Sequence, residues 1–503
     1  MAKCKTATCS LTLPLRVEKW QIDKLDKRFE IARKIYNIFV GFELKKLNRL
    51  KQTPEYREIL HEIKLKNQDK EKNKAEIKAL YNKRNAILKQ WNFTELRFTN
   101  DMTTMNKYYS SNFGAITSQS ISNDAWRAFN TLLFGKGEQI KFKKIGAVNS
   151  VSGKSFNREI RLIPSKNCIE WKGLTLPYRV ERGNLYEEKM LSHKVKYVRI
   201  LRKWANTKYN YYAQIVLEGV PEPKINKKTG ELLHPIGEGR VGLDIGPQTI
   251  AYVSDTEVGL TELADKVVSI EKEKRRLSRK LDRSKRATNP TNYNQDGITK
   301  HGVKLTHNKS KRYLITQEEL KTLYRKQADI RKLQHNILTN KLLSLGSEFY
   351  VEKMSIIGLA RRAKKTEISE KTGKFKRKRR YGKSITNKAP AMLLQILNNK
   401  LKAQSLSKLI EIDTYNAKAS QFDHINETYT KKSLSQRWTK LDNGDEIQRD
   451  LYSAFLIQNT DNTLKAFDKV LLNEKYSNFK IMHDAFINQL KEQSTYHPTS
   501  MGV

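Results

Sequence analysis

Cysteine and long apolar runs are both scarce in this chain of 503 residues. Only Cys4, Cys9 and Cys168 are present, which excludes a disulfide framework and a four-cysteine zinc site and favours a reducing compartment. No window approaches the roughly 18 consecutive apolar residues of a membrane span. Polar residues and Pro14 interrupt the N-terminal apolar stretch, so it makes a poor signal peptide. We therefore expect a cytoplasmic protein with no membrane partner.

Acidic residues are too few to balance the basic ones, with 53 Asp and Glu against 97 Lys and Arg and a formal net charge of +44. A surplus of this size needs a polyanion. Because Lys and Arg run through every region rather than beside one amphipathic helix, nucleic acid is favoured over an acidic membrane. Binding of that kind is strongly salt-sensitive. The alternative is a highly soluble basic protein with no particular polyanion.

The length of the whole chain suggests about three domains. Its N-terminal half divides into a strand, a helical block and a β-rich block. The opening segment SLTLPLRV alternates as one strand. Residues 20–134 carry apolar side chains at three- and four-residue spacing, which predicts helices. Residues 135–238 alternate again, in the segments IKFKKI, REIRLI, KVKYVRIL and NYYAQIVLEG. The helical block is therefore interpreted as an insertion into a β domain made of residues 1–19 and 135–238.

Residues 239–503 are organised differently. VGLDIG and TIAYVSD predict a hairpin, and a third, weaker strand is expected near Val267 to Ile270. A very basic helix, a long helix from about Leu314 to Leu345, the strand SEFYVEKM, another helix, the strand LIEID and a closing helix from about Ile447 follow. Three strands, helix, strand, helix, strand, helix is the connectivity of the ribonuclease H class of α/β nucleases. The fold class expected for the chain is therefore α/β and multidomain.

Three carboxylates stand at unusual places in this third region. Asp244 lies inside the apolar strand VGLDIG, Glu352 ends the apolar strand FYVE, and Asp450 lies at the start of the helix IQRDLYSAFLI. A carboxylate in an apolar element is costly unless it is paired or bound to metal. Two Mg²⁺ ions about 3.5–4 Å apart can cleave a phosphodiester and need hard oxygen ligands. Each acid alone has an ordinary structural explanation, but three in this order predict a phosphodiester-cleaving site.

Two basic segments are candidates for binding phosphate backbones. An isolated helix with cations around most of its circumference would repel itself, so the first segment is expected to lie against nucleic acid. Its residues are Arg275, Arg276, Arg279, Lys280, Arg283, Lys285 and Arg286. The second is a loop after Glu352 that is expected to order over a bound strand, although a disordered, nonspecific tether remains an alternative. Its residues are Lys376, Arg377, Lys378, Arg379, Arg380 and Lys383.

The segments VGLDIGPQTIAYVSD, FYVEKMSIIGLARR and IQRDLYSAFLI resemble the three RuvC motifs of TnpB, a family of RNA-guided nucleases related to CRISPR type V effectors. The resemblance implies a helical recognition lobe inserted in a β-barrel wedge domain, followed by an RNase H-like RuvC nuclease domain. It implies that Asp244, Glu352 and Asp450 bind Mg²⁺ and catalyse cleavage. It also implies a structured guide RNA and a target DNA that is cut next to a short flanking motif.

Two positions depart from the family pattern. Ser420 and Gln421 look like the family segment that often precedes a zinc ribbon, but Phe422, Asp423 and His424 follow, and no cysteine occurs up to the C-terminus. We therefore expect no zinc, and an insertion at about 415–446 that packs around its own aromatic residues, for example Phe422, Tyr429 and Trp438. The second departure is Tyr452, which stands where the family usually has Asn.

Four other functions stay open at this point. A compact CRISPR type V effector with a CRISPR RNA differs from TnpB in its neighbouring genes and RNA rather than in its motifs. A nuclease-inactive RNA-guided repressor is expected to have lost one of the three acids, all of which are present here. A DNA transposase with the same core would need no guide. A generic RNA-binding protein would be inert toward DNA.

Overall fold

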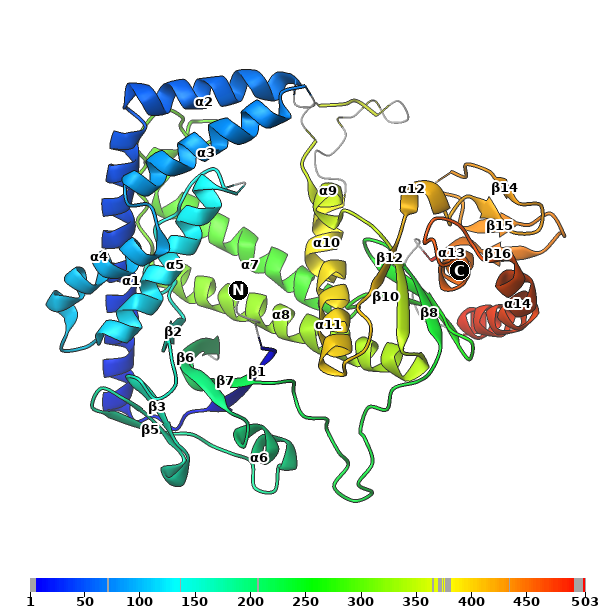
Figure 1. The fold of residues 1–503 in the computed structure, drawn as a ribbon, viewed down its shortest axis with the longest axis horizontal. Coiled ribbons are helices and arrows are strands. Elements are labelled where there is room, and N and C mark those ends of the chain that lie inside the picture. Colours follow the sequence, from blue (N-terminus) through cyan, green and yellow to red (C-terminus); the bar gives the residue numbers. More distant parts are fainter. Residues whose placement is uncertain are drawn as a thin grey trace. The chain divides into compact units, whose positions relative to one another are not determined.

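The computed structural model describes residues 6–69, 72–135, 137–205, 208–363, 366–369, 373, 375, 381–433, 435–492 and 501–502. The chain forms two compact units, Met1–Pro223 and Lys224–Val503. Helices and strands are mixed in both units (Figure 1). The fold is therefore α/β and multidomain, as the sequence predicts.

The first unit combines helices with two antiparallel sheets. Its helices are α1 (Lys19–Leu50), α2 (Pro54–Lys66), α3 (Lys74–Gln90), α4 (Glu95–Asn106), α5 (Ala115–Leu133) and α6 (Leu185–Leu191). Its strands are β1 (Thr8–Pro14), β2 (Ser150–Ser152), β3 (Ile160–Ile163), β4 (Cys168–Trp171), β5 (Leu174–Pro177), β6 (Val195–Ala205) and β7 (Lys208–Glu218). The opening strand β1 pairs with β7, from Thr8 opposite Glu218 to Pro14 opposite Tyr212. Helices α1 to α5 are therefore inserted, along the chain, between two strands that pair in one sheet.

The expected β-barrel is not closed within the described residues. The strands form one sheet in the order β1-β7-β6-β2 and a separate sheet in the order β3-β4-β5. The segment IKFKKI, expected as a strand, is irregular. Its backbone at Lys143 bonds instead to α1, because the Asn37 side chain accepts from the Lys143 N–H at 2.8 Å and donates to its carbonyl at 2.9 Å. Side chains of a helix therefore replace the ladder that a further strand would supply.

The second unit is built on a five-stranded sheet. Its strands are β8 (Arg240–Ile245), β9 (Thr249–Val253), β10 (Val258–Glu262), β11 (Glu348–Glu352) and β12 (Ile410–Ile412), followed by the short β13 (Phe422–Asp423), β14 (Thr428–Tyr429), β15 (Trp438–Lys440) and β16 (Glu446–Gln448). Its helices are α7 (Val267–Thr288), α8 (Lys311–Leu345), α9 (Ile356–Ala360), α10 (Gly382–Lys388), α11 (Pro390–Ala403), α12 (Thr414–Ala417), α13 (Arg449–Gln458) and α14 (Lys469–Glu492). The order is β10-β9-β8-β11-β12. β8 is antiparallel to β9 and parallel to β11.

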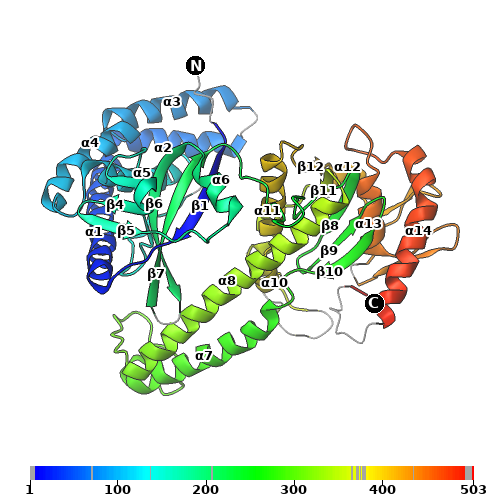
Figure 2. The same ribbon diagram turned by 90° about the horizontal axis from the view of Figure 1, so that it is seen from below.

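Each face of this sheet buries its own hydrophobic cluster. Val241, Leu243 and Ile245 of β8 pack with leucines of α8 and α11. The other face packs against α13 and α14, through residues such as Leu451 and Phe455. Figure 2 shows the sheet between these two layers. Because side chains alternate along a strand, Asp244 belongs to the face that α13 covers.

The prediction of a strand near Val267 to Ile270 is wrong. The third strand is β10, which pairs with β9, and Val267 begins α7. Val267, Ile270 and Leu277 are buried in α7. They lie one and then two helical turns apart, so they share one face of a helix. α7 and the long helix α8 then pack side by side (Figure 2).

Candidate active site

The backbone of α13 lies directly on β8. A Cβ at Gly242 would overlap the carbonyl oxygen of Ala454 and would lie 2.5 Å from the backbone nitrogen of Gln458. Two residues earlier on the strand, the Gln458 side-chain amide donates a hydrogen bond of 3.1 Å to the carbonyl of Arg240. Helix α13 and strand β8 therefore run in opposite directions. Moving two residues along β8, from Gly242 to Arg240, corresponds to moving four residues along α13, from Ala454 to Gln458.

One more step of this series pairs Asp450 with Asp244. Four helical residues rise about 6 Å and two strand residues advance about 6.6 Å, so the two spacings stay matched. Glu352 comes from the neighbouring strand. Val351 pairs with Leu243 in the parallel β8–β11 ladder, so Glu352 and Asp244 follow in adjacent positions, on strands about 4.8 Å apart.

The three predicted acids line one pocket of about 680 Å³. The pocket is also lined by Ser420 and Gln421 of the insertion and by four cationic side chains: Lys431, Lys432, Arg437 and Arg449. Asp244, Glu352 and Asp450 are each half-buried. The structure thus brings together carboxylates that are far apart in the chain: Asp244 and Asp450 are separated by 206 positions.

Asp244 and Glu352 carry poorly compensated charge. Burial raises the pKa of Asp244 well above its ordinary value, and the nearby Asp450 and Glu352 raise that pKa further. Burial likewise raises the pKa of Glu352. Within the described part of the chain, no side chain donates a hydrogen bond or forms a salt bridge to either carboxylate. Carboxylates held in this way favour a partner that brings positive charge.

Asp450 is held by two arginines. Arg449 Nε and Nη2 lie 3.2 and 3.1 Å from Asp450 Oδ1, and Arg437 Nη1 lies 3.8 Å from Asp450 Oδ2. Arg449 Nη1 also donates to the carbonyl of Gln436 at 2.9 Å. Arg449 therefore links the first turn of α13 to the insertion, whereas Arg437 contributes a longer, single ion pair.

The donor set suits a hard cation. Asp244 and Glu352 offer carboxylate oxygens without donors, which is the ligand chemistry of Mg²⁺, and Asp450 offers oxygens that it shares with arginines. As the side chains stand, no group of three or more His, Cys, Asp or Glu among the described residues is spaced to hold one metal ion. The residues present therefore fit Mg²⁺ in the type of donor atom that they offer.

The cysteine-free insertion is held by side-chain packing. The Phe422 ring lies 4.9 Å from the ring of Tyr429 and 5.1 Å from that of Phe467, centroid to centroid. The Tyr452 hydroxyl accepts from the His424 backbone N–H at 3.0 Å and donates to His424 Nδ1 at 2.7 Å. Burial lowers the pKa of His424, in keeping with a neutral ring that accepts this bond. Tyr452 therefore fastens the insertion to α13.

Trp438 packs on a neighbour outside the insertion. Its indole contacts the His483 ring of α14 at a centroid distance of 6.1 Å, and its Nε1 donates to the carbonyl of Gly502 at 2.8 Å. The expected aromatic packing of the insertion therefore includes Phe422 and Tyr429, while Trp438 joins the insertion to the C-terminal part of the chain.

The basic helix α7 is less uniformly charged at its surface than its sequence suggests. Lys274, which also belongs to the basic run, is buried between α7 and α8, where its Nζ bonds to Gln327 Oε1 at 2.8 Å. Arg276 pairs with Glu273 at 2.6 Å, and Arg286 pairs with Asp282 at 2.9 Å.

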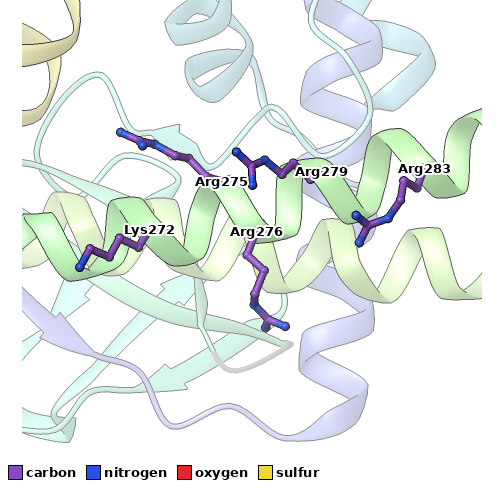
Figure 3. Close-up of a pocket in the computed structure, with 5 residues that line it drawn as sticks. All are labelled: Lys272, Arg275, Arg276, Arg279 and Arg283. Atoms are coloured by element: carbon purple, nitrogen blue, oxygen red, sulfur yellow. The ribbon is translucent and has the colours of Figure 1, made fainter. Parts of the chain in front are cut away.

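Five cations of α7, including the paired Arg276, lie around one hollow. Lys272, Arg275, Arg276, Arg279 and Arg283 line a hollow of about 310 Å³ (Figure 3). In Figure 3, Arg275 and Arg279 project to one side of the helix and Arg276 to the other. Lys280 and Lys285 are half-buried.

The structure describes only part of the second basic segment. Lys376, Arg377, Lys378, Arg379 and Arg380 lie outside the described residues. Lys383 is the first basic residue of α10 and lies 3.7 Å from Glu271 of α7.

No motif in the sequence singles out the four cations of the pocket. Arg449 alone carried a local signal, because it is the first residue of α13 and a cation is disfavoured at the positive end of a helix dipole. Its position is compensated by Asp450 and the Gln436 carbonyl. Lys431, Lys432 and Arg437 lie in a segment whose path over the pocket has no periodic signature.

In the described residues, no helix combines the length and the apolar character needed to cross a membrane. No family profile and no curated protein sequence matches the chain. Its structure is similar to a cryo-EM structure of a Cas12f1–sgRNA–target DNA complex, with a TM-score of 0.42 and 11% identity over 89% of this chain and 98% of that chain. A cryo-EM structure of a CRISPR-Cas12f ternary complex is similar with a TM-score of 0.28 and 13% identity, over 88% of this chain and 82% of that chain. At these scores the similarities assign no activity to this chain.

Proposed function

We propose that this protein is an RNA-guided DNA endonuclease that hydrolyses phosphodiesters with Mg²⁺ at Asp244, Glu352 and Asp450. The observation that carries the proposal is the convergence of these acids, from β8, β11 and α13, on one pocket. The raised pKa of Asp244, which both other acids increase, supports their proximity. The strand order and directions of the second unit support a RuvC-like, RNase H-like core.

The pocket has the charges that phosphodiester hydrolysis requires. Asp244, Glu352 and Asp450 would hold two Mg²⁺ ions, which activate water and offset the charge of the phosphoryl oxygens when bound. Arg437 and Arg449 lie at the same wall, where guanidinium groups can stabilise charge that develops on a phosphate. The half-buried position of the acids limits the water around them and strengthens these interactions.

The guide RNA belongs to the proposal because of the motifs and the charge. The three RuvC-like segments resemble TnpB, and the net charge of +44 supplies ample backbone-binding surface. If base pairing with a guide reads the sequence, the protein needs to recognise only the backbone, the duplex shape and a short flanking motif. Helix α7 supports this, since its exposed cations line one hollow and cations of this kind can bind phosphates without reading bases.

The test is cleavage by an isosteric variant. Asp244→Asn should abolish Mg²⁺-dependent cleavage of a guide-matched DNA, a loss of at least 100-fold on the scale of a removed charge-stabilising group, while guide affinity stays unchanged. Asp244→Asn should also melt no lower than the wild type, because the pKa of Asp244 shows that its charge is held unfavourably. Asp442→Asn is the matched control, since Asp442 is exposed and outside the pocket. Full cleavage by Asp244→Asn would refute the catalytic assignment.

RNA that co-purifies with the protein separates the remaining candidates. A discrete structured RNA from a transposon end supports the TnpB-type function, and a CRISPR RNA supports a compact type V effector. Specific binding of transposon-end DNA without RNA would indicate a transposase. RNA-guided binding without cleavage would indicate a repressor, and binding of RNA with no activity on DNA would indicate a generic RNA-binding protein.

We also propose that the insertion at about 415–446 folds without zinc. Its packing on Phe422 and the Tyr452–His424 bonds supports this. Elemental analysis of the purified protein should find less than stoichiometric zinc, and a zinc chelator should leave the melting temperature unchanged. One tightly bound zinc per chain would contradict the proposal.

A further inference from the structure

Met501 and Gly502 lie against the hairpin that follows Arg437. Strands β15 and β16 form this hairpin, and Trp438 of β15 pairs with Gln448 of β16. Trp438 Nε1 donates a hydrogen bond of 2.8 Å to the carbonyl of Gly502. Gln448 Nε2 donates one of 3.0 Å to the carbonyl of Met501. Two successive carbonyls of one segment therefore bind the two side chains of one cross-strand pair.

The Met501 side chain anchors this segment. It is only 2% exposed and belongs to the hydrophobic cluster that also contains Ile447 and Leu451. Burial of an apolar side chain among neighbours from a hairpin and a helix favours one position of the segment over others. Apolar packing and two hydrogen bonds therefore hold the same two residues in place.

The Gln448 side chain connects this segment to the helix of Asp450. Its Oε1 accepts a hydrogen bond of 2.8 Å from the backbone N–H of Leu451 and thereby caps the first turn of α13. Its Nε2 is bound to Met501. Gln448 is fully buried, so both ends of its amide need a protein partner. Asp450 lies in the capped turn, and the Met501 carbonyl therefore helps to orient it.

Gly502 packs directly on the stem of Arg437. A Cβ at Gly502 would overlap Arg437 Cβ and would lie 2.7 Å from its Cγ. Because the backbone fixes the position of a Cβ, this atom cannot turn away as the tip of a side chain can. The Arg437 carbonyl accepts from the Arg449 N–H at 2.8 Å, and Arg437 Nη1 lies 3.8 Å from Asp450 Oδ2. Gly502 therefore limits where the Arg437 side chain can lie beside Asp450.

We propose that Met501 and Gly502 are positioning residues of the nuclease site. They hold Asp450 through the cap that Gln448 provides, and they hold Arg437 by direct contact. The inference rests on the proposed function, because it concerns the geometry of the catalytic groups. One short segment thus fixes both members of the Arg437–Asp450 pair, which come from different elements.

The test compares two glycines with the same conformational demand. In the intact protein, Gly502→Ala adds a methyl group that meets Arg437, at a φ of +72°. Gly444→Ala adds one at a φ of +89° with nothing within 4 Å, and Gly444 does not line the acid pocket. Both changes strain a left-handed backbone, so their difference isolates the contact with Arg437. Below both melting transitions, Gly502→Ala should lower kcat about tenfold with little change in KM, and Gly444→Ala should match the wild type.

A second readout does not depend on cleavage. Hydrogen exchange measures the local opening of backbone amides, and a peptide of residues 446–453 contains the bonded amides of Arg449 and Leu451. This peptide should exchange about fivefold faster in Gly502→Ala than in Gly444→Ala, on the scale of one lost hydrogen bond. A peptide from β1 in the first unit should exchange equally in both variants.

Met501 gives an independent pair of variants. Met501→Leu keeps the apolar volume and should retain the exchange rate and the kcat of the wild type. Met501→Asp places a charge in the buried cluster and should release the segment, with the same two effects as Gly502→Ala.

Three results would overturn the inference. The first is unchanged exchange of residues 446–453 in Gly502→Ala. The second is faster exchange with an unchanged kcat, because the segment would then stabilise the hairpin without positioning the site. The third is an equal effect of the two glycine variants or of the two Met501 variants. Failure of the proposed function has a different signature, namely cleavage that survives Asp244→Asn, and it leaves the exchange results in place.

Discussion

The backbone of Ala454 occupies the space that a side chain at Gly242 would need. This contact sets the distance between α13 and β8, and through it the approach of Asp450 to Asp244. The absence of a Cβ at Gly242 is therefore a requirement of the site, although Gly242 itself carries no chemistry.

Gly242→Ala should displace α13 and separate the acids. The added methyl meets backbone atoms of Ala454 and Gln458, so the clash should cost about 1–3 kcal/mol and cleavage should fall at least tenfold. Ala454→Gly should not rescue it, because the atom in contact is a carbonyl oxygen. Gly246→Ala is the stability control, since its Cβ would meet nothing closer than 3.5 Å. Melting temperatures and cleavage rates measure both effects, and an unchanged Gly242→Ala protein would contradict the register.

The two arginines at Asp450 should respond differently to lysine. Arg449 contacts Asp450 through two nitrogens and the Gln436 carbonyl through a third, a fork that lysine cannot reproduce. Arg437 makes one contact of 3.8 Å, which needs mainly charge. We expect Arg449→Lys to lower kcat about tenfold or more and Arg437→Lys to lower it less than threefold, on the scale of one charge-assisted hydrogen bond. Equal losses in steady-state cleavage assays would show that the fork has no special role.

Tyr452→Phe should loosen the insertion over the pocket. The change leaves the buried backbone N–H of His424 without its acceptor, at a cost of about 1–3 kcal/mol. Because Ser420 and Gln421 line the pocket from this insertion, KM for DNA should rise more than kcat falls. Tyr415→Phe makes the same chemical change in the same segment at a side chain that is 83% exposed, and it should be neutral. If both variants behave alike, the hydroxyl does not position the insertion.

A histidine near the start of α13 should make stability depend on pH. The backbone N–H of Gln448 donates to His483 Nε2 at 3.0 Å, so Nε2 accepts and the ring donates to Asp484 Oδ1 through Nδ1 at 2.8 Å. Burial lowers the pKa of His483. The unfolded chain therefore binds this proton more readily than the folded chain, and stability falls as the pH drops below about 6.5, the ordinary histidine pKa.

His483→Gln should reduce the loss of stability that the protein shows at acidic pH. Urea unfolding at about pH 7.5 and about pH 5.5, on either side of the ordinary histidine pKa, gives the free energy of unfolding at each pH. The difference should shrink in His483→Gln and stay as in the wild type in the exposed His61→Gln control. His424, His335 and His234, whose pKa values are also lowered by burial, should contribute to the remainder. An unchanged difference in His483→Gln would show that His483 does not titrate across folding.

Local patterns predicted most elements of the second unit and failed where pairing partners decide. Short apolar runs identified the strands around Asp244 and Glu352, because these strands are buried on both faces of the sheet. Val267 to Ile270 satisfied both an apolar run and a helical period, and only the packing of α7 on α8 selects the helix. The segment IKFKKI alternates well, yet Asn37 takes its backbone bonds. No local signal reports that partner, which is 106 positions away.

The sequence by itself determined the chemistry that is available: three carboxylates in apolar elements, a large surplus of cations and an insertion without cysteine. These follow from residue type and local period. Only the tertiary structure decided that the carboxylates share a pocket and that Arg437 and Arg449 face Asp450. The physical reason is that such positions depend on close contacts between distant segments, such as Ala454 on Gly242, whose distance and register no single segment encodes.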